Sequence, residues 1–389
     1  MNKEERFFIS LLSDHLALKK TEPQYDLEWK RILHLAQIHQ VGGIVYFQCK
    51  SFIPDDVKPL FYKHYTASLY SYVNYTLEIK RIEQAFHEHG IEMFTVKGLE
   101  VAKYYPYPEL RTMGDIDIVV QTSKRREADD ILHQFHYESI SHREDIEWEY
   151  YKQGKRIELH DCLIYNQVIN KDKIERFFNN FLSYVKDGTI DVSFHFLFII
   201  EHLKKHLLNS GVGFRQFMDL AVMTKSEPAL DWKWINEKLD ELGLKTFSSV
   251  CFAFVQRWFS ITAPIDMTDI EEEFFEDATE KIFSNGVFGF DNTENVVNAA
   301  VNAARNNKIH LLGMIKGALK YVFPSYKDLS DKKFYPYLAG RPYLLPVSWI
   351  HRFIRGIWSF GRAKKNMRLK FTTTDTIKER DRYLKKWDL

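Results

Sequence analysis

Two aspartates separated by one residue, Asp115 and Asp117, are the side chains in this sequence best suited to chemistry. They lie at the start of an apolar, β-branched run, residues 116–120, that is typical of a β-strand. Side chains alternate along a strand, so both carboxylates leave one face while Ile116 and Ile118 leave the other. Neighbouring carboxylates repel unless a cation lies between them, and hard divalent cations prefer oxygen ligands. The pair alone fits either a metal site or a solvated strand face.

The residues around this pair favour a site for phosphate. Lys97 and Gly98 follow a short β-prone run and precede a helix-like stretch. A turn of this kind can offer backbone N–H groups to phosphate oxygens, and the lysine adds a positive charge. Arg111 supplies a planar donor fork that matches phosphate, and Gly114 permits a close backbone approach. These neighbours make the metal and phosphate interpretation of the pair preferable.

Residues 96–120, VKGLEVAKYYPYPELRTMGDIDIVV, resemble the active-site signature of the polymerase-β-like nucleotidyltransferases. More narrowly, they are similar to a bacterial nucleotidyltransferase family with a Lys-Gly, Arg, Asp-x-Asp core and to the nucleotidyltransferase toxins of abortive-infection systems. The resemblance implies that the paired acids bind catalytic metals, that a glycine turn holds the triphosphate and that a third acid comes from a later strand. Leu99 departs from the superfamily's Ser or Gly, and the gap from Gly98 to Asp115 is longer than in shorter-looped members.

Glu158 is the expected third acid. In the run 156–160, Ile157 and Leu159 share one face of a predicted strand, and Glu158 and His160 share the other. An exposed edge strand would show the same alternation. Three further acids have strand spacing and are the fallback: Asp145, Glu147 and Glu149. We interpret these three as a solvated face, because no turn or glycine brings them near the aspartate pair.

A second segment carries charged and histidine pairs at helical spacing. His202 and His206 are four residues apart, which suits zinc, but the glutamate of an HExxH motif and a third ligand are absent. Arg215 and Asp219 can pair across one helical turn. The resemblance includes a helix pair of this kind on the catalytic core. On that interpretation Arg215, together with His202 or Lys205, would face the nucleotide.

The chemistry-bearing residues belong to a short unit, residues 91–165, between helical regions at 1–90 and 166–389. We therefore expect an α+β fold with a small mixed-sheet nucleotidyltransferase core and helical regions at both ends. Strands are expected at 91–96, 116–120, 137–141, 148–151 and 157–160. Helices are expected from Pro54 to His89, after a Ser123 cap, and at 193–208, 214–223, 232–258, 269–284, 291–305 and 346–360.

Net charge and cysteine usage exclude several classes of protein. The 389 residues include 54 Lys and Arg against 53 Asp and Glu, so bulk charge does not indicate a polyanion binder. Three distant cysteines, Cys49, Cys162 and Cys251, indicate neither a zinc site nor a disulfide framework. The acidic N-terminus is unlike a signal peptide, and no run approaches the roughly 18 apolar residues of a membrane span. We expect a cytoplasmic protein without a transmembrane segment.

The C-terminal stretch 341–374 is basic and contains no acid. Its eight cations are Arg341, Arg352, Arg355, Arg362, Lys364, Lys365, Arg368 and Lys370. Aromatic residues lie between them, which suits nucleic-acid phosphates and bases or an anionic membrane surface. A terminal helix that docks its aromatic residues and exposes its basic face would look the same. All three interpretations stay open.

The sequence thus predicts a metal-dependent nucleotidyltransferase that moves a nucleoside monophosphate from an NTP, such as ATP, to an acceptor hydroxyl with release of pyrophosphate. The predicted catalytic and metal-binding residues, for Mg²⁺ or Mn²⁺, are Asp115, Asp117 and Glu158. The predicted nucleotide-binding residues are Lys97, Gly98, Arg111, Gly114 and Arg215. RNA, a protein or a small molecule could be the acceptor. The alternative is a catalytically degenerate nucleotide- or RNA-binding helical module.

Overall fold

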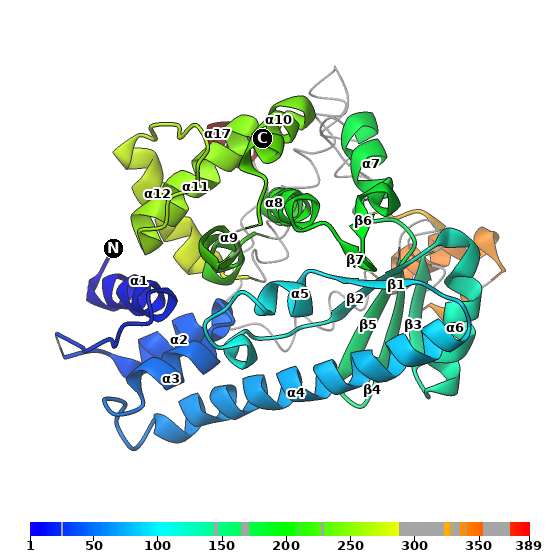
Figure 1. Cartoon of the computed structure of the whole chain (residues 1–389), viewed down its shortest axis with the longest axis horizontal. Coiled ribbons are helices and arrows are strands. Elements are labelled where there is room, and N and C mark those ends of the chain that lie inside the picture. The colour runs from blue at the N-terminus through cyan, green and yellow to red at the C-terminus, as the bar shows by residue number, and fades with distance from the viewer. Residues whose placement is uncertain are drawn as a thin grey trace.

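The computed structural model describes residues 1–24, 26–143, 147–164, 171–209, 211–226, 229–287, 323–326, 329, 335–338, 340–352 and 374–389. A five-stranded mixed sheet lies beside a larger group of helices, and one long helix runs along both (Figure 1). This is the expected α+β architecture, with helices at both ends of the chain.

The N-terminal region is helical, as predicted. Its helices are α1 (Lys3–Leu16), α2 (Trp29–Ile38), α3 (Gly42–Cys49) and α4 (Lys58–Glu88). Helix α4 has 31 residues and is therefore about 46 Å long. It begins at Lys58, four residues after the expected start, with Pro59 in its first turn, where a missing N–H does little harm. Gly90 follows the helix with φ at +66°, a conformation that favours glycine.

The sheet places the predicted strands side by side in the order β1-β2-β5-β4-β3. The strands are β1 (Met93–Val96), β2 (Ile116–Val120), β3 (Glu138–Arg143), β4 (Glu147–Lys152) and β5 (Lys155–His160). Strand β2 pairs in parallel with β5 and antiparallel with β1, while β3, β4 and β5 form an antiparallel meander. All five residues of β2 are buried, so this strand lies inside the molecule.

Short helices connect the strands, and one expectation about them is wrong. Helix α5 (Gly98–Ala102) follows β1, and α6 (Arg125–Gln134) follows β2. Ser123 does not cap α6, because residues 122–124 form a 3-10 turn and the residue before the helix, Lys124, makes no side-chain cap hydrogen bond. The 3-10 turns are Pro108–Leu110, Thr122–Lys124, Phe181–Tyr184, Pro336–Leu338 and Pro342–Leu344.

The C-terminal region is again mostly helical. Its elements are α7 (Lys171–Asn179), β6 (Val185–Lys186), β7 (Thr189–Ile190), α8 (Val192–Asn209), α9 (Phe214–Ser226), α10 (Trp232–Leu242), α11 (Lys245–Phe259), α12 (Glu272–Asn285) and α17 (Thr374–Lys386). The helix expected at 232–258 is two helices, which Gly243 separates with φ at +69°. The helix expected at 291–305 lies outside the described residues, as do the second half of that expected at 346–360 and the basic stretch beyond Arg352.

The two faces of the sheet pack into two different cores. Ile116, Ile118 and Val120 of β2 join the core formed with α4 and α6. Val119 joins a second, larger core that contains the helices from both ends of the chain. In that core the ring of Phe8 from α1 contacts Phe214 of α9. The N-terminal and C-terminal helices therefore stabilise each other, and the domain boundaries at 90 and 165 stay a prediction.

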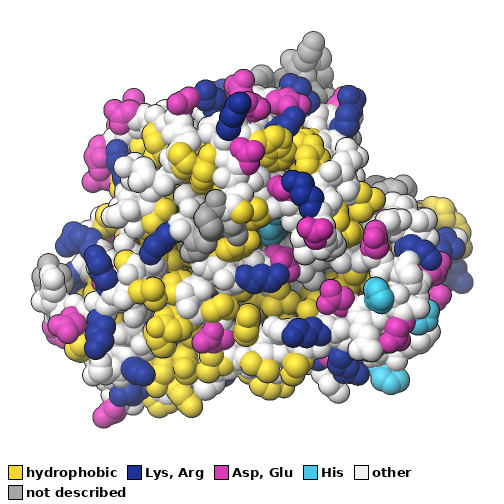
Figure 2. Space-filling view, viewed as in Figure 1, with side chains coloured by type: hydrophobic (Ala, Val, Ile, Leu, Met, Phe, Trp, Pro, Cys, Tyr) yellow, Lys and Arg dark blue, Asp and Glu magenta, His cyan; other side chains and the backbone are white. Residues whose placement is uncertain are grey.

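The visible surface carries charges of both signs. Figure 2 shows basic and acidic side chains interspersed over this face, while hydrophobic side chains gather where Figure 1 places α3 and α4. Exposed hydrophobic residues of α4 are Leu60, Tyr62, Tyr70, Val73 and Leu77. Within the described part of the chain, no helix combines the length and apolar character needed to cross a membrane.

Candidate active site

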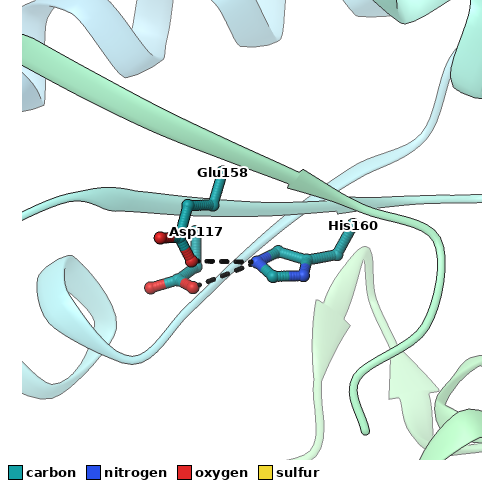
Figure 3. Close-up of side chains that lie close together, drawn as sticks. All are labelled: Asp117, Glu158 and His160. Atoms are coloured by element: carbon teal, nitrogen blue, oxygen red, sulfur yellow. Dashed lines mark hydrogen bonds and ion pairs between the residues drawn. The ribbon is translucent and has the colours of Figure 1, made fainter. Parts of the chain in front are cut away.

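The parallel pairing of β2 and β5 brings two of the predicted acids together. Asp117 lies opposite Glu158 in the register, and Val119 lies opposite His160. Nε2 of His160 is 3.2 Å from Oδ1 of Asp117 and 3.6 Å from Oε2 of Glu158 (Figure 3). The three side chains offer ligand atoms that all lie within 4.8 Å of one another. Among the described residues they are the one group of this kind, and His160 joins it although the sequence assigned it no role.

Lys97 forms an ion pair with one of these acids, Asp117. Its Nζ is 2.5 Å from Oδ1 of Asp117, and both side chains are largely buried. The backbone of Lys97 has φ at +59°, which is strained for a residue with a side chain. Its backbone N–H donates to Nε2 of His195 on α8, at 3.1 Å. Burial lowers the pKa of His195 to about 4, so this imidazole stays neutral and can accept the hydrogen bond.

The charges of the site are unevenly balanced. Burial and then the carboxylates of Asp117 and Glu158 raise the pKa of Asp115 to about 6. Burial opposes ionisation of Asp117 as well, but Lys97 and then His160 hold its pKa below the usual range. For Lys97, burial acts to lower the pKa, and Asp117 and Glu158 outweigh it and raise it. Lys97, and then Arg215, act to lower the pKa of Asp115, but burial and the repulsion from the other two carboxylates outweigh them.

Asp115 lies one residue before β2 and opens onto a cleft beside Asp117. The cleft encloses about 560 Å³, including its open mouth. Its lining comes from the β1–α5 turn, the segment before β2, β2 itself, α8 and α9. It consists of Lys97, Gly98, Arg111, Gly114, Asp115, Asp117, Ile199, His202, Leu203, His206, Arg215, Gln216 and Asp219. All five predicted nucleotide-binding residues therefore line one cleft with two of the three predicted catalytic acids.

Arg111, which we expected to present its donor fork to phosphate, pairs with Asp219 instead. Its Nε and Nη2 each lie 2.8 Å from a carboxylate oxygen of Asp219, a bidentate pair that is buried. Tyr105 also donates to Asp219, at 2.8 Å. The expected pair between Arg215 and Asp219 across one turn of α9 is therefore wrong. The ion pair of Asp219 with Arg111 instead connects α9 with the segment that leads into β2.

Arg215 keeps donor capacity toward the cleft. Its Nη1 donates to the backbone oxygen of Thr112 at 3.1 Å, and within the described residues its buried Nε has no hydrogen-bond partner. Burial, and then the nearby Arg111, lower its pKa to about 10, so the guanidinium stays charged at neutral pH. A bound anion would satisfy this group.

Two of the histidines of α8, His202 and His206, contact each other. Nε2 of His206 lies 2.9 Å from Nε2 of His202, and both rings line the cleft. Burial, and then the charge of Lys97, keep the pKa of His206 at about 3 and that of His202 well below its ordinary value. At neutral pH the pair is uncharged, and one ring donates to the other.

The two predicted glycines have open surroundings. A Cβ on Gly98 would meet its first neighbour, Cε of Met113, at 3.4 Å, which is ordinary contact. A Cβ on Gly114 would meet no atom within 4 Å, and the carbonyl of Gly114 accepts a hydrogen bond from Tyr75 at 3.1 Å. In this structure neither position requires a glycine on steric grounds.

The fallback acids are placed as follows. Glu149 of β4 lies opposite Glu158 of β5, but it is not part of the metal-compatible group. Asp145 lies outside the described residues, and β4 begins at Glu147. Sequence reasoning missed the contacts of His160, His195 and Tyr105. Only His160 gave a signal, through its alternation with Glu158.

A protein family model described as an uncharacterised nucleotidyltransferase matches residues 25–260, which is more than half of the chain. The chain belongs to this family. The matched range runs from before α2 to the end of α11 and includes every residue of the cleft. No curated protein and no solved structure matches the chain. Family membership assigns nucleotidyl transfer as the general activity and an NTP as the substrate.

Proposed function

We propose that this nucleotidyltransferase moves a nucleoside monophosphate from an NTP to an acceptor hydroxyl in a reaction that depends on divalent metal. The acceptor oxygen forms a bond to the α-phosphorus, the bond from that phosphorus to the bridging oxygen breaks, and pyrophosphate leaves. The hydroxyl proton passes to a base or to water. The observation that carries the proposal is the packing of Asp117, Glu158 and His160 within 4.8 Å at the edge of the cleft.

The donor set fits a divalent cation. Asp117 and Glu158 of that group, together with Asp115 beside them, would hold it, and carboxylate oxygens are the ligands that Mg²⁺ prefers. The imidazole of His160 in the same group also suits Mn²⁺. Asp117 and Glu158 still raise the pKa of Asp115 although Lys97 and Arg215 oppose them, so added positive charge would relieve the repulsion. When bound, such ions stabilise the entering and leaving oxygens of an in-line displacement.

The cations of the cleft would bind the triphosphate. Arg215 has an unpartnered Nε and is the most direct candidate for a phosphate contact. Lys97 and the Gly98 turn lie beside the acids, where they would meet the β- and γ-phosphates once the ammonium shares Asp117 with a metal. Nε and Nη2 of Arg111 donate to Asp219, which leaves only Nη1 for another acceptor. Arg111 would therefore contribute mainly positive charge to the lining of the cleft.

Glu158 would orient or deprotonate the acceptor hydroxyl. It lies in the metal-compatible group and not in the lining of the cleft. A carboxylate there can accept the hydroxyl proton while the triphosphate occupies the cleft. The resemblance to polymerase-β-like enzymes, in which a third acid comes from a later strand, supports the same role.

The test incubates the protein with each α-labelled NTP, Mg²⁺ or Mn²⁺, and a cell extract, and measures pyrophosphate release and transfer of the label. We expect release with the wild type, loss in Asp117→Asn and retention in Asp130→Asn, an exposed acid on α6. Nucleotide binding without pyrophosphate release under any condition would contradict the proposal and favour the degenerate binding module.

A further inference from the structure

One residue of helix α4, Tyr75, contacts the backbone of both strands that lead to the predicted acids. Its side chain is 5% exposed and packs in the core that α4 and α6 form with the sheet. The helix runs along the sheet, so it can contact several strands from one side (Figure 1). Tyr75 does not belong to the lining of the cleft, so it can act on the site only through the residues that it contacts.

The hydroxyl of Tyr75 joins the two strands just before their pairing begins. The parallel register of β2 and β5 starts with Ile116 opposite Ile157. Two residues before Ile116, the carbonyl of Gly114 accepts a hydrogen bond from the Tyr75 hydroxyl at 3.1 Å. One residue before Ile157, the backbone N–H of Arg156 donates to the same hydroxyl oxygen. A hydroxyl can donate and accept at once, so this one group bridges the two strands.

The bridged backbone segments lead directly to two of the proposed metal ligands. Asp115 follows Gly114, and Glu158 lies two residues after Arg156. The pairing of β2 with its neighbours begins after Asp115, so the strand register does not by itself fix this residue. Burial and then the charge of Asp115 raise the pKa of Tyr75, which indicates that the carboxylate lies near the hydroxyl. The bridge therefore lies beside the acids as well as between their strands.

Helix α4 also holds the start of β5 one turn after Tyr75. Glu78 is 4% exposed, and its carboxylate oxygens lie 3.1 Å from Nζ of Lys152 and 2.9 Å from Nζ of Lys155. These two lysines flank the turn between β4 and β5. The first half of the same helix packs in the larger core through Phe61. The helix therefore supports the start of β5, and Tyr75 extends that support to the segment before β2.

We propose that Tyr75 is a positioning residue of the active site, which sets the spacing of Asp115 and Glu158 through the backbone of their two strands. Carboxylates from different strands must be held at a fixed separation to share a cation such as Mg²⁺, which demands near-ideal geometry at short oxygen distances. Loss of a group that orients metal ligands typically costs about 10- to 100-fold in metal affinity or activity. This inference rests on the proposed function and adds to it a residue outside the cleft.

The test variant is Tyr75→Phe, which keeps the ring in the core and removes the bridging oxygen. The matched control is Tyr150→Phe on β4. Tyr150 is fully buried in the same core, and its hydroxyl donates to Asp129 of α6 at 2.7 Å. The control therefore also loses a hydrogen bond of a core tyrosine, but one that does not reach the strands at the acids. Both substitutions should lower the melting temperature.

Three measurements on the full chain, made well below the melting temperatures, separate positioning from fold stability. In Tyr75→Phe the Kd for Mn²⁺ should rise about tenfold or more, and kcat for pyrophosphate release should fall by a similar factor. The KM for NTP should change by less than about threefold, because Lys97 and Arg215 keep their contacts in the cleft. Amide hydrogen exchange at the start of β5 should become faster, because the N–H of Arg156 loses its acceptor. Tyr150→Phe should leave all of these quantities unchanged.

The outcomes separate this inference from the proposed function. A Tyr75→Phe protein with the Mn²⁺ affinity and kcat of the wild type overturns Tyr75 as a positioning residue and leaves the proposed function intact. Equal losses in Tyr75→Phe and Tyr150→Phe overturn it as well, because lower stability alone would then explain them. A wild type that neither binds Mn²⁺ nor releases pyrophosphate contradicts the proposed function and this inference together.

Discussion

One face of strand β2 is wholly apolar, whereas the other carries the buried Asp117 beside Val119. Toward α4 and α6 the strand presents Ile116, Ile118 and Val120, each at most 2% exposed. Toward the cleft it presents Asp117, which is also buried but contacts Lys97 and His160. The first face gains free energy from burying apolar surface, and the second loses free energy by burying charge.

This difference indicates that the apolar face contributes mainly to stability and the acidic face mainly to activity. The acidic face is held by polar contacts from distant parts of the chain, such as the bidentate pair of Arg111 and Asp219. The apolar face needs only side chains of matching size. Substitutions on the acidic face should therefore change activity more than stability, and substitutions on the apolar face should change stability more than activity.

The largest expected effect is that of Asp117→Asn on the acidic face. The amide keeps the shape but loses the charge that would hold a metal, so pyrophosphate release should fall by about a thousandfold or more. The melting temperature should fall only in part, because the loss of the buried partner of Lys97 is offset by the loss of repulsion from Asp115 and Glu158. Steady-state kinetics and calorimetry measure both quantities. Full metal-dependent activity in this variant would remove Asp117 from the active site.

Ile118→Ala, one residue along the strand, should give the opposite result. Ile118 is fully buried between the sheet and the helices α4 and α6. Its truncation should lower the free energy of unfolding by about 2–5 kcal/mol, while the folded protein keeps its kcat. Urea unfolding and kinetics at low temperature check this. The matched control is Val73→Ala, at an exposed position of α4, which should be nearly neutral. A selective loss of kcat in Ile118→Ala would contradict the contrast between the faces.

Asp219→Asn should affect stability and nucleotide binding together. The variant leaves the buried guanidinium of Arg111 without its counter-charge, which should cost about 1–3 kcal/mol of unfolding free energy and raise the KM for NTP. Glu272→Gln is the control, because its pair with Arg257 is 70% exposed on the glutamate side and should contribute less than about 1 kcal/mol. Equal effects of the two substitutions would show that Asp219 has no special supporting role.

The smallest expected effect is a loss of stability in acid. Burial, and then His34, lower the pKa of His39 to about 3, whereas the unfolded chain binds this proton near pH 6.5. Between these values the unfolded state binds more protons, so stability falls as the pH falls from about 6.5 toward 3. His39→Phe should flatten the fall in melting temperature, because a ring still packs against Phe214. His133→Phe, at a half-exposed position, should leave the slope unchanged. If the melting temperature of His39→Phe falls with pH as steeply as that of the wild type, the buried imidazole of His39 is not the cause of the fall.

The strands of the site could be predicted from the sequence because the alternation of apolar and polar residues along a strand is a local pattern. Residues 116–120 are the observed strand, and Glu158 falls where the alternation of β5 predicts it. Gly90 follows α4 as expected, since a residue with φ at +66° there favours glycine. Membership of a nucleotidyltransferase family agrees with the predicted class of activity.

The polar contacts could not be read in this way. Arg111 and Asp219 are 108 residues apart, and Lys97 and His195 are 98 apart, so no periodic pattern relates them. Asp219 had a suitable partner one helical turn away in Arg215, and local spacing therefore favoured the wrong pair. The predicted Ser123 cap is wrong because a 3-10 turn that includes Ser123 forms before α6. A serine alone does not indicate whether an α-helix or a 3-10 turn begins there.

The most direct test of the central claim is the binding of Mn²⁺, followed by electron paramagnetic resonance of the free ion. Asp115, Asp117 and Glu158 are claimed to form a divalent metal site at the edge of the cleft. The wild type and Asp130→Asn should remove the six-line signal of free Mn²⁺ in a saturable manner. Asp117→Asn and Glu158→Gln should leave most of that signal in place. Equal uptake of Mn²⁺ by all four proteins would contradict the claim.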